Sequence, residues 1–232
     1  MALTTPPRSG LYCPDDCIPY PYTDVASYVP RDYPWMYPAL LAPIAFVLLV
    51  VCIPSVAPAR RQQFSLAGMC LAMVAAGILV LDYGLQLSVV QPSLLAGESS
   101  GLSLLSQYNP HGVFIGLENI GYGLLALALV LLRIPLTKVL SRNARVAGWI
   151  FTFGGTLTLL LLVLLAALYR DRLDVRFEVF ALLLSHLVLA TSGNLVGIAF
   201  SPWRAQESHL ATSAPVKREL THREGDPRAR PD

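Results

Sequence analysis

The chain has 232 residues, of which 54% are hydrophobic and only 14% are charged, and its formal net charge is +2. Its mean hydropathy is +0.55. Soluble domains usually carry about 25% charged residues, so this composition argues against an ordinary soluble domain and favours a chain of lipid-facing helices. The small net charge gives no indication of a nucleic-acid partner.

The first predicted part is an N-terminal segment, 1–37, which is rich in Pro and Tyr and contains Cys13 and Cys17 in the sequence CPDDC. A metal site would normally pair this motif with a second one, and the sequence has none. Two alternatives therefore stay open. The cysteines form a local disulfide if this end faces an oxidising compartment, or they are two free thiols.

Five long apolar segments follow. Each is about as long as the 20 helical residues that a hydrocarbon core of about 30 Å requires, and in lipid such a run satisfies its backbone only as a helix. They predict an all-α, polytopic transmembrane helix bundle of five spans over 38–200. The spans are 38–57, with Pro43 and Pro54 as sites of bending, then 64–90, 112–132, 147–169 and 177–200.

The basic residues predict the orientation of these spans. Twelve of the 17 Lys and Arg residues lie in the loops 58–63 and 133–146 and in the tail 201–232. By the positive-inside rule these parts are cytoplasmic and the N-terminus is outside. The tail is polar and mixed in charge, which predicts disorder. We expect the two outer segments, 12–37 and 91–111, to fold together as a lid.

Three ionisable side chains lie inside the predicted spans: Asp82, Glu118 and His186. At 1.5 Å per residue, all three lie about 10–13 Å below the outer surface. A charge in mid-membrane costs about 2.5–3.5 kcal/mol, whereas a polar bond between helices returns about 0.6–2 kcal/mol. This difference favours a functional site over a purely structural pin.

Helical spacing adds polar and small residues to the same faces. On the second predicted span the shared face contains Gly68, Ala72, Ala75, Asp82 and Gln86, and on the last it contains His186, Ala190, Gly193, Asn194 and Gly197. The predicted ligand or proton pocket, in the outer half of the bundle, consists of Asp82, Gln86, His111, Glu118, Asn119, Tyr122, His186 and Asn194.

This set of side chains suits three classes of function. The first is binding of a small or lipid-like ligand, or relay of a proton or cation. The second is an intramembrane enzyme that acts on a lipid or isoprenoid, with Glu118 or Asp82 as acid or base. The third is a structural or accessory subunit. No metal or cofactor is expected, because the spacing of His111 and His186 matches no zinc motif.

Two G-x-x-x-G patterns, Gly112 to Gly116 and Gly193 to Gly197, predict faces where helices pack closely. A seam between copies in a homo-oligomer is the alternative.

Three stretches of the sequence resemble a family of small prokaryotic multi-pass membrane proteins. They are PRDYPWMYPA at 30–39, VVQPSLL at 89–95 and QYNPHG at 107–112, within a resemblance over about residues 20–200. The resemblance implies a prokaryotic cytoplasmic membrane. It brings no assigned activity, so it implies no catalytic residue.

Overall fold

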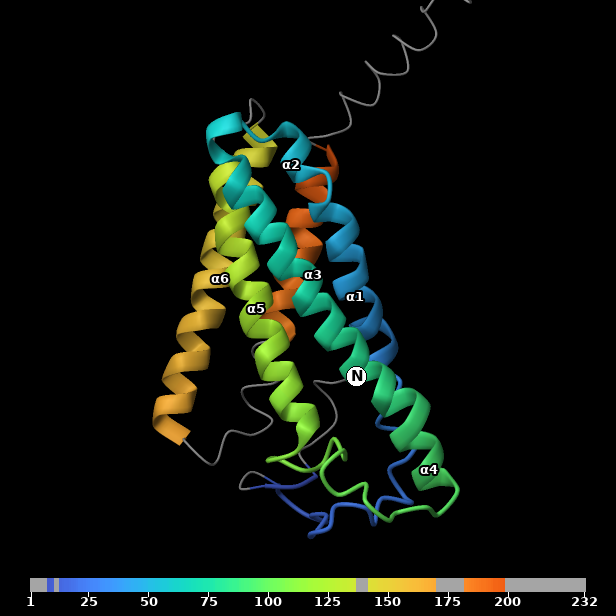
Figure 1. Cartoon of the computed structure of the whole chain (residues 1–232). Helices are drawn as coiled ribbons and strands as arrows, with labels where there is room; N and C mark the ends of the chain where they lie inside the picture. The colour runs from blue at the N-terminus through green and yellow to red at the C-terminus, as the bar shows by residue number, and fades with distance from the viewer. Residues whose placement is uncertain (1–7, 11–12, 137–141, 170–181, 199–232) are drawn as a thin grey trace, which may run out of the picture. The chain divides into compact units, whose positions relative to one another are not determined.

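A computed structural model of the protein describes residues 8–10, 13–136, 142–169 and 182–198. All of them belong to one contact unit, Met1–Ala199. Within these residues every regular element is helical (Figure 1). The tail 201–232, for which we predicted disorder, lies outside the described residues.

The helices follow the predicted apolar segments, with shifted ends. Four helical stretches are long and apolar enough to cross a membrane: Met36–Ser55, Ala59–Leu95, Val113–Leu136 and Arg142–Leu164. A further apolar helix, Leu182–Ile198, is shorter than these four, and the flanking residues 177–181 and 199–200 lie outside the described part of the chain. The fifth span therefore stays a prediction.

Proline interrupts the first stretch once. Helix α1, Met36–Val50, contains Pro43 without a break, and α2, Ile53–Val56, begins after a two-residue turn with Pro54 in its first turn. Proline has no N–H to continue the helical ladder and is tolerated where a helix begins. Of the two predicted sites of bending, Pro54 marks the interruption.

The second stretch is longer than predicted. The short helix Ala59–Arg61 leads into α3, Gln62–Leu85, which continues through a π-helical turn, Gln86–Val90, into α4, Gln91–Leu95. The residues 91–95 are therefore helical, and the expectation that they begin the outer loop is wrong. Pro92 sits in the first turn of α4, where its missing N–H is tolerated.

The long helices contact each other in a ring. α3 packs against both α1 and α5, Val113–Leu136, which in turn packs against α6, Arg142–Tyr169. The helix Leu182–Ile198 shares an apolar cavity with α1 and contacts Gly154 of α6 through Val188. Between these helices, the side chains of Phe46 (α1) and Phe151 (α6) are both buried, and their aromatic ring centroids lie 6.4 Å apart.

The outer faces of the helices carry large exposed apolar side chains. Leu48 is 68% exposed, Phe153 is 72% exposed and Val163 is 69% exposed. Soluble proteins rarely expose apolar patches of this kind over several elements, whereas a hydrocarbon environment favours them. The exposed faces of the helices are therefore compatible with a membrane protein.

One end of the bundle is covered by irregular chain, which we call the cap: the described residues of 8–35 together with 96–112. Figure 1 shows the blue N-terminal segment and the green loop between α4 and α5 at this end. The Ser106 hydroxyl donates to the carbonyl of Tyr22 at 2.8 Å, and Ser9 donates to the carbonyl of Tyr108. The two outer segments that we expected to fold together are thus in contact.

Candidate functional site

Glu118 lies in a buried polar cluster between α3 and α5. The hydroxyl of Tyr83 donates to Oε1 of Glu118 at 2.5 Å, and it lies 2.9 Å from the hydroxyl of Tyr122. Glu118 is 2% exposed, Tyr83 is fully buried and Tyr122 is 3% exposed. We call these three residues the carboxylate–tyrosine cluster. Glu118 and Tyr122 share a face of α5 because they are four residues apart.

The predicted inward face of α3 is the buried one. Asp82 and Gln86 are both 2% exposed. The small residues of the same predicted face, Gly68, Ala72 and Ala75, are also buried. Gln86 donates from Nε2 to the carbonyl of Leu105 in the cap at 2.5 Å. This bond ties the π-helical turn that follows α3 to the loop that covers it.

Aromatic side chains lie between the cluster and the cap. Trp35, just before α1, contacts Tyr83 edge-on at 5.8 Å between ring centroids and Phe114 at 6.5 Å. Phe114 in turn lies 6.1 Å from Tyr83, and it precedes Glu118 by one helical turn. These rings pack around the phenol that donates to Glu118, and the carboxylate itself is buried from solvent.

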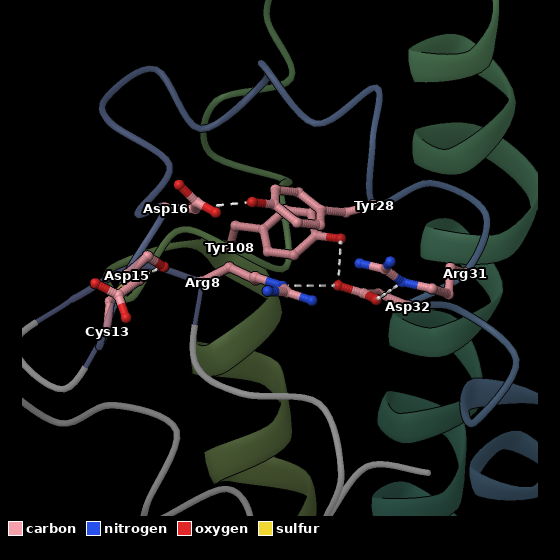
Figure 2. A network of polar contacts seen from close by, with 8 residues as sticks. All are labelled: Arg8, Cys13, Asp15, Asp16, Tyr28, Arg31, Asp32 and Tyr108. Atoms are coloured by element: carbon pink, nitrogen blue, oxygen red, sulfur yellow. Dashed lines mark hydrogen bonds and ion pairs between the residues drawn. The ribbon is translucent and has the colours of Figure 1, made fainter.

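A second polar network holds the cap together, and Figure 2 shows its side chains. Asp32, which is 4% exposed, pairs with Arg8 and with Arg31 at 3.3 Å each. The hydroxyl of Tyr108 donates to the same carboxylate at 3.4 Å. The guanidinium of Arg8 also lies 4.2 Å from the ring centroid of Tyr28. One buried carboxylate thus connects both segments of the cap.

Two buried tyrosines of the cap have raised pKa values and so resist ionisation. Burial, together with the negative charge of Asp32, raises the pKa of Tyr108 above its ordinary value of about 10. Burial likewise raises the pKa of Tyr33, which neighbours Asp32 in sequence. Both phenols therefore stay protonated and neutral, and the Tyr108 phenol remains a donor to the buried carboxylate.

The histidines predicted for the pocket lie elsewhere. His111 is exposed in the loop before α5, where its backbone N–H donates to Oδ1 of Asn109 at 3.0 Å. His186 is half-buried, and its Nδ1 lies 2.7 Å from the carbonyl of Leu182 in its own helix. It lines an apolar cavity of about 330 Å³ together with α1 residues such as Phe46. The carboxylate–tyrosine cluster, in contrast, is formed by α3 and α5.

The two predicted asparagines also lie outside the cluster. Asn194 is exposed and donates to the carbonyl of Ala190 in its own helix at 2.8 Å. Asn119 is half-buried and follows Glu118, so it points about 100° away around α5.

The inward face of the last helix differs from the predicted one. Its buried residues are Ser185, Val188, Ser192 and Val196, which follow the helical spacing of three and four. The predicted face through His186, Ala190 and Asn194 begins one residue later and is therefore rotated by about 100°. Val188 packs against α6, and this contact sets the rotation of the helix.

The structure joins Cys13 and Cys17 in a disulfide, with 5.8 Å between their Cα atoms. Among the residues that the structure describes, no group of three or more His, Cys, Asp or Glu side chains is placed to hold a metal ion.

Sequence reasoning missed Tyr83, Trp35, Asp32 and Tyr108. For Tyr83 a signal was present, because a phenol beside a charged residue within an apolar helix needs a polar partner. Asp32 carries no such signal, since it lies in a polar segment where a carboxylate is ordinary.

Comparison with known proteins adds no relative: no family model matches the chain, and no curated protein or solved structure is significantly similar to it.

Proposed function

We propose that the chain is a multi-pass protein of a prokaryotic cytoplasmic membrane, whose carboxylate–tyrosine cluster relays a proton or cation, or holds a small ligand, in the outer half of the bundle. The hydrogen bond of 2.5 Å from Tyr83 to Glu118 carries this proposal. With Tyr122 at 2.9 Å, three titratable oxygen groups from two helices form a continuous hydrogen-bonded path. A path of this kind suits proton transfer better than it suits binding of a bulky molecule.

The orientation is part of the same proposal. The disulfide lies in the cap, and disulfides persist on the oxidising side of a membrane. The arginines at the other end of the bundle, such as Arg61 and Arg133, favour the cytoplasmic side for that end. Five spans with an outer N-terminus and a cytoplasmic C-terminus agree with both observations.

The test is proton movement into proteoliposomes that enclose a pH-sensitive dye, driven by an imposed membrane potential. We expect Glu118→Gln to reduce the initial rate at least ten-fold, because the amide cannot exchange a proton. Tyr83→Phe removes the donor to Glu118 and should have a similar effect. Tyr37→Phe is the matched control, since Tyr37 is 58% exposed at the start of α1.

Thermal unfolding in detergent, measured on the same variants, separates function from stability. If the Glu118→Gln variant moves protons as fast as the wild-type protein and only unfolds at a lower temperature, the cluster serves stability alone. The relay is then excluded. A wild-type rate no greater than that of empty liposomes would exclude it as well.

A further inference from the structure

Arginines gather at the end of the bundle opposite the cap, where α3 begins, α5 ends and α6 begins. Nη1 of Arg61 donates to the carbonyl of Ile134 at 2.8 Å, which joins the start of α3 to the end of α5. The guanidinium of Arg133, in the last turn of α5, lies 4.0 Å from the ring centroid of Trp149 on α6. The described contacts thus hold two arginines at the junction of three helices.

Gly148 allows Arg133 to lie directly on α6. A Cβ at this position would be 3.6 Å from Cγ of Arg133 and 3.3 Å from Cβ of Leu136. Arg142, Arg145 and Trp149 are three and four residues apart, so they share a face of α6, and all three are exposed. The side chains of α6 therefore extend the basic surface from Arg133 along the helix.

The positive charge at this junction has no acidic neighbour in the sequence around it. The loops 58–63 and 133–146 contain no Asp or Glu. In addition, Nε of Arg133 is buried and has no hydrogen-bond partner within the described part of the chain. The basic residues of these loops therefore favour an anionic partner at this end of the bundle.

The surface next to the arginines is apolar. Trp149 is 62% exposed, and Phe153 and Leu160 follow it on the same face of α6 with 72% and 61% exposure. Tryptophan prefers the interface between headgroups and acyl chains. A soluble anion would contact only the arginines, whereas a phospholipid would contact the arginines with its phosphate and this face with its acyl chain.

We propose that Arg133, Arg145 and Trp149 form a binding site for an anionic phospholipid, with the lipid phosphate accepting hydrogen bonds from the guanidinium groups. Basic pockets between helix ends on the cytoplasmic side are suited to such headgroups. The site is separate from the carboxylate–tyrosine cluster: it rests on the proposed membrane placement and orientation, but not on the proposed relay.

The test uses Trp149 as the reporter. In the full-length chain, Trp35→Phe and Trp203→Phe leave Trp149 as the only tryptophan. The protein is placed in phosphatidylcholine bilayers that contain increasing fractions of brominated phosphatidylglycerol or, separately, brominated phosphatidylcholine. We expect phosphatidylglycerol to quench Trp149 at lower mole fractions. Each arginine near an anionic surface contributes about five-fold to affinity. Arg133→Gln and Arg145→Gln should therefore each lower the preference for phosphatidylglycerol over phosphatidylcholine about five-fold.

Arg60→Gln is the matched control, because it removes the same charge from an exposed residue of the short helix Ala59–Arg61. If Arg60→Gln lowers the preference for phosphatidylglycerol as much as Arg145→Gln does, the preference comes from general surface charge. That result would overturn the proposal. So would equal quenching by the two brominated lipids in the protein with unchanged arginines, a comparison that needs no arginine variant to fold. Relief of quenching by millimolar inorganic phosphate would assign the site to a soluble anion.

Discussion

At the scale of single residues, Asp32 is the group on which the cap depends. Its buried carboxylate accepts from Arg8, Arg31 and Tyr108. An unpaired carboxylate that is 4% exposed would be strongly unfavourable. The three donors compensate for that cost, and they bring an N-terminal arginine and a loop tyrosine into the same place.

The raised pKa of Tyr108 makes the cap sensitive to alkali. Because the folded protein holds the phenolic proton more tightly than the unfolded chain does, the stability that this group contributes is complete below pH of about 10 and is lost as the pH rises toward the folded value. We expect hydrogen exchange of the backbone in the cap to accelerate above pH 10, after correction for the intrinsic rate. Tyr108→Phe should weaken this pH dependence.

Tyr20→Phe is the control for this prediction, since Tyr20 is 76% exposed. Equal pH profiles for Tyr108→Phe and the wild-type protein would contradict it.

In the bundle, a phenol that was not among the predicted pocket residues donates to Glu118. It belongs to Tyr83, the neighbour in sequence of the predicted pocket residue Asp82. Adjacent residues on a helix point about 100° apart. A sequence therefore identifies the turn of the helix that carries polar groups, whereas the rotation of the helix decides the direction in which each of its side chains points.

At the scale of elements, glycines allow α5 to lie close to its neighbours α6 and α3. A Cβ at Gly155 would be 2.5 Å from the carbonyl oxygen of Ala126. On the other side of α5, a Cβ at Gly121 would meet Leu79 of α3 at 2.6 Å. Small residues at such points let helix backbones pack without a side chain between them.

We expect Gly155→Ala to lower the free energy of unfolding by about 1–3 kcal/mol, because the added methyl group meets backbone that cannot rotate away. Gly116→Ala is the matched control, since a Cβ there meets nothing within 4 Å. Its effect should stay within about 1 kcal/mol and be neutral or stabilising. Reversible unfolding in mixed micelles, followed by circular dichroism, measures both values. Equal losses for the two variants would contradict the described packing of α5 on α6.

The two G-x-x-x-G patterns do not mark the closest helix contacts. Gly116 and Gly197 have no atom within 4 Å of a Cβ position, and Gly193 has only Leu49 at 3.9 Å. Gly112 is close to Leu104 and Asn109 of the cap. Whether the open glycines meet another copy of the chain stays a prediction.

At the scale of the whole molecule, the bundle has two different ends. The cap end carries the disulfide and the buried Asp32 network, and the opposite end carries Arg61 and Arg133. Between them lie the exposed apolar faces. This difference between the two ends is the reason for our proposal that the cap lies on the outer side of the membrane.

Thiol labelling in intact cells tests the orientation. After mild reduction, we expect a membrane-impermeant maleimide to label Cys13 and Cys17, since both lie in the cap. Cys52 and Cys70 are exposed in the isolated chain but lie in apolar helical stretches, so lipid should protect them. A Cys13→Ser, Cys17→Ser variant should take up no label. Labelling of the wild-type cap only after permeabilisation would reverse the proposed orientation.

The sequence by itself determined the helical class, the positions of four long apolar helices and the buried face of α3. Composition and spacing act locally, so the length of an apolar run and the period of its small residues are read directly from neighbouring positions. Helix ends were less certain, as the continuation of α3 through Gln91–Leu95 demonstrates.

Only the tertiary structure decided which polar groups meet. The pairing of Glu118 with Tyr83, the separation of His186 from them and the gathering of the cap around Asp32 depend on how each helix is rotated against its neighbours. That rotation is set by packing between residues far apart in sequence, such as Gly121 on Leu79 and Gly154 on Val188. A periodic pattern fixes the face of a helix only to within one residue, and one residue corresponds to about 100°.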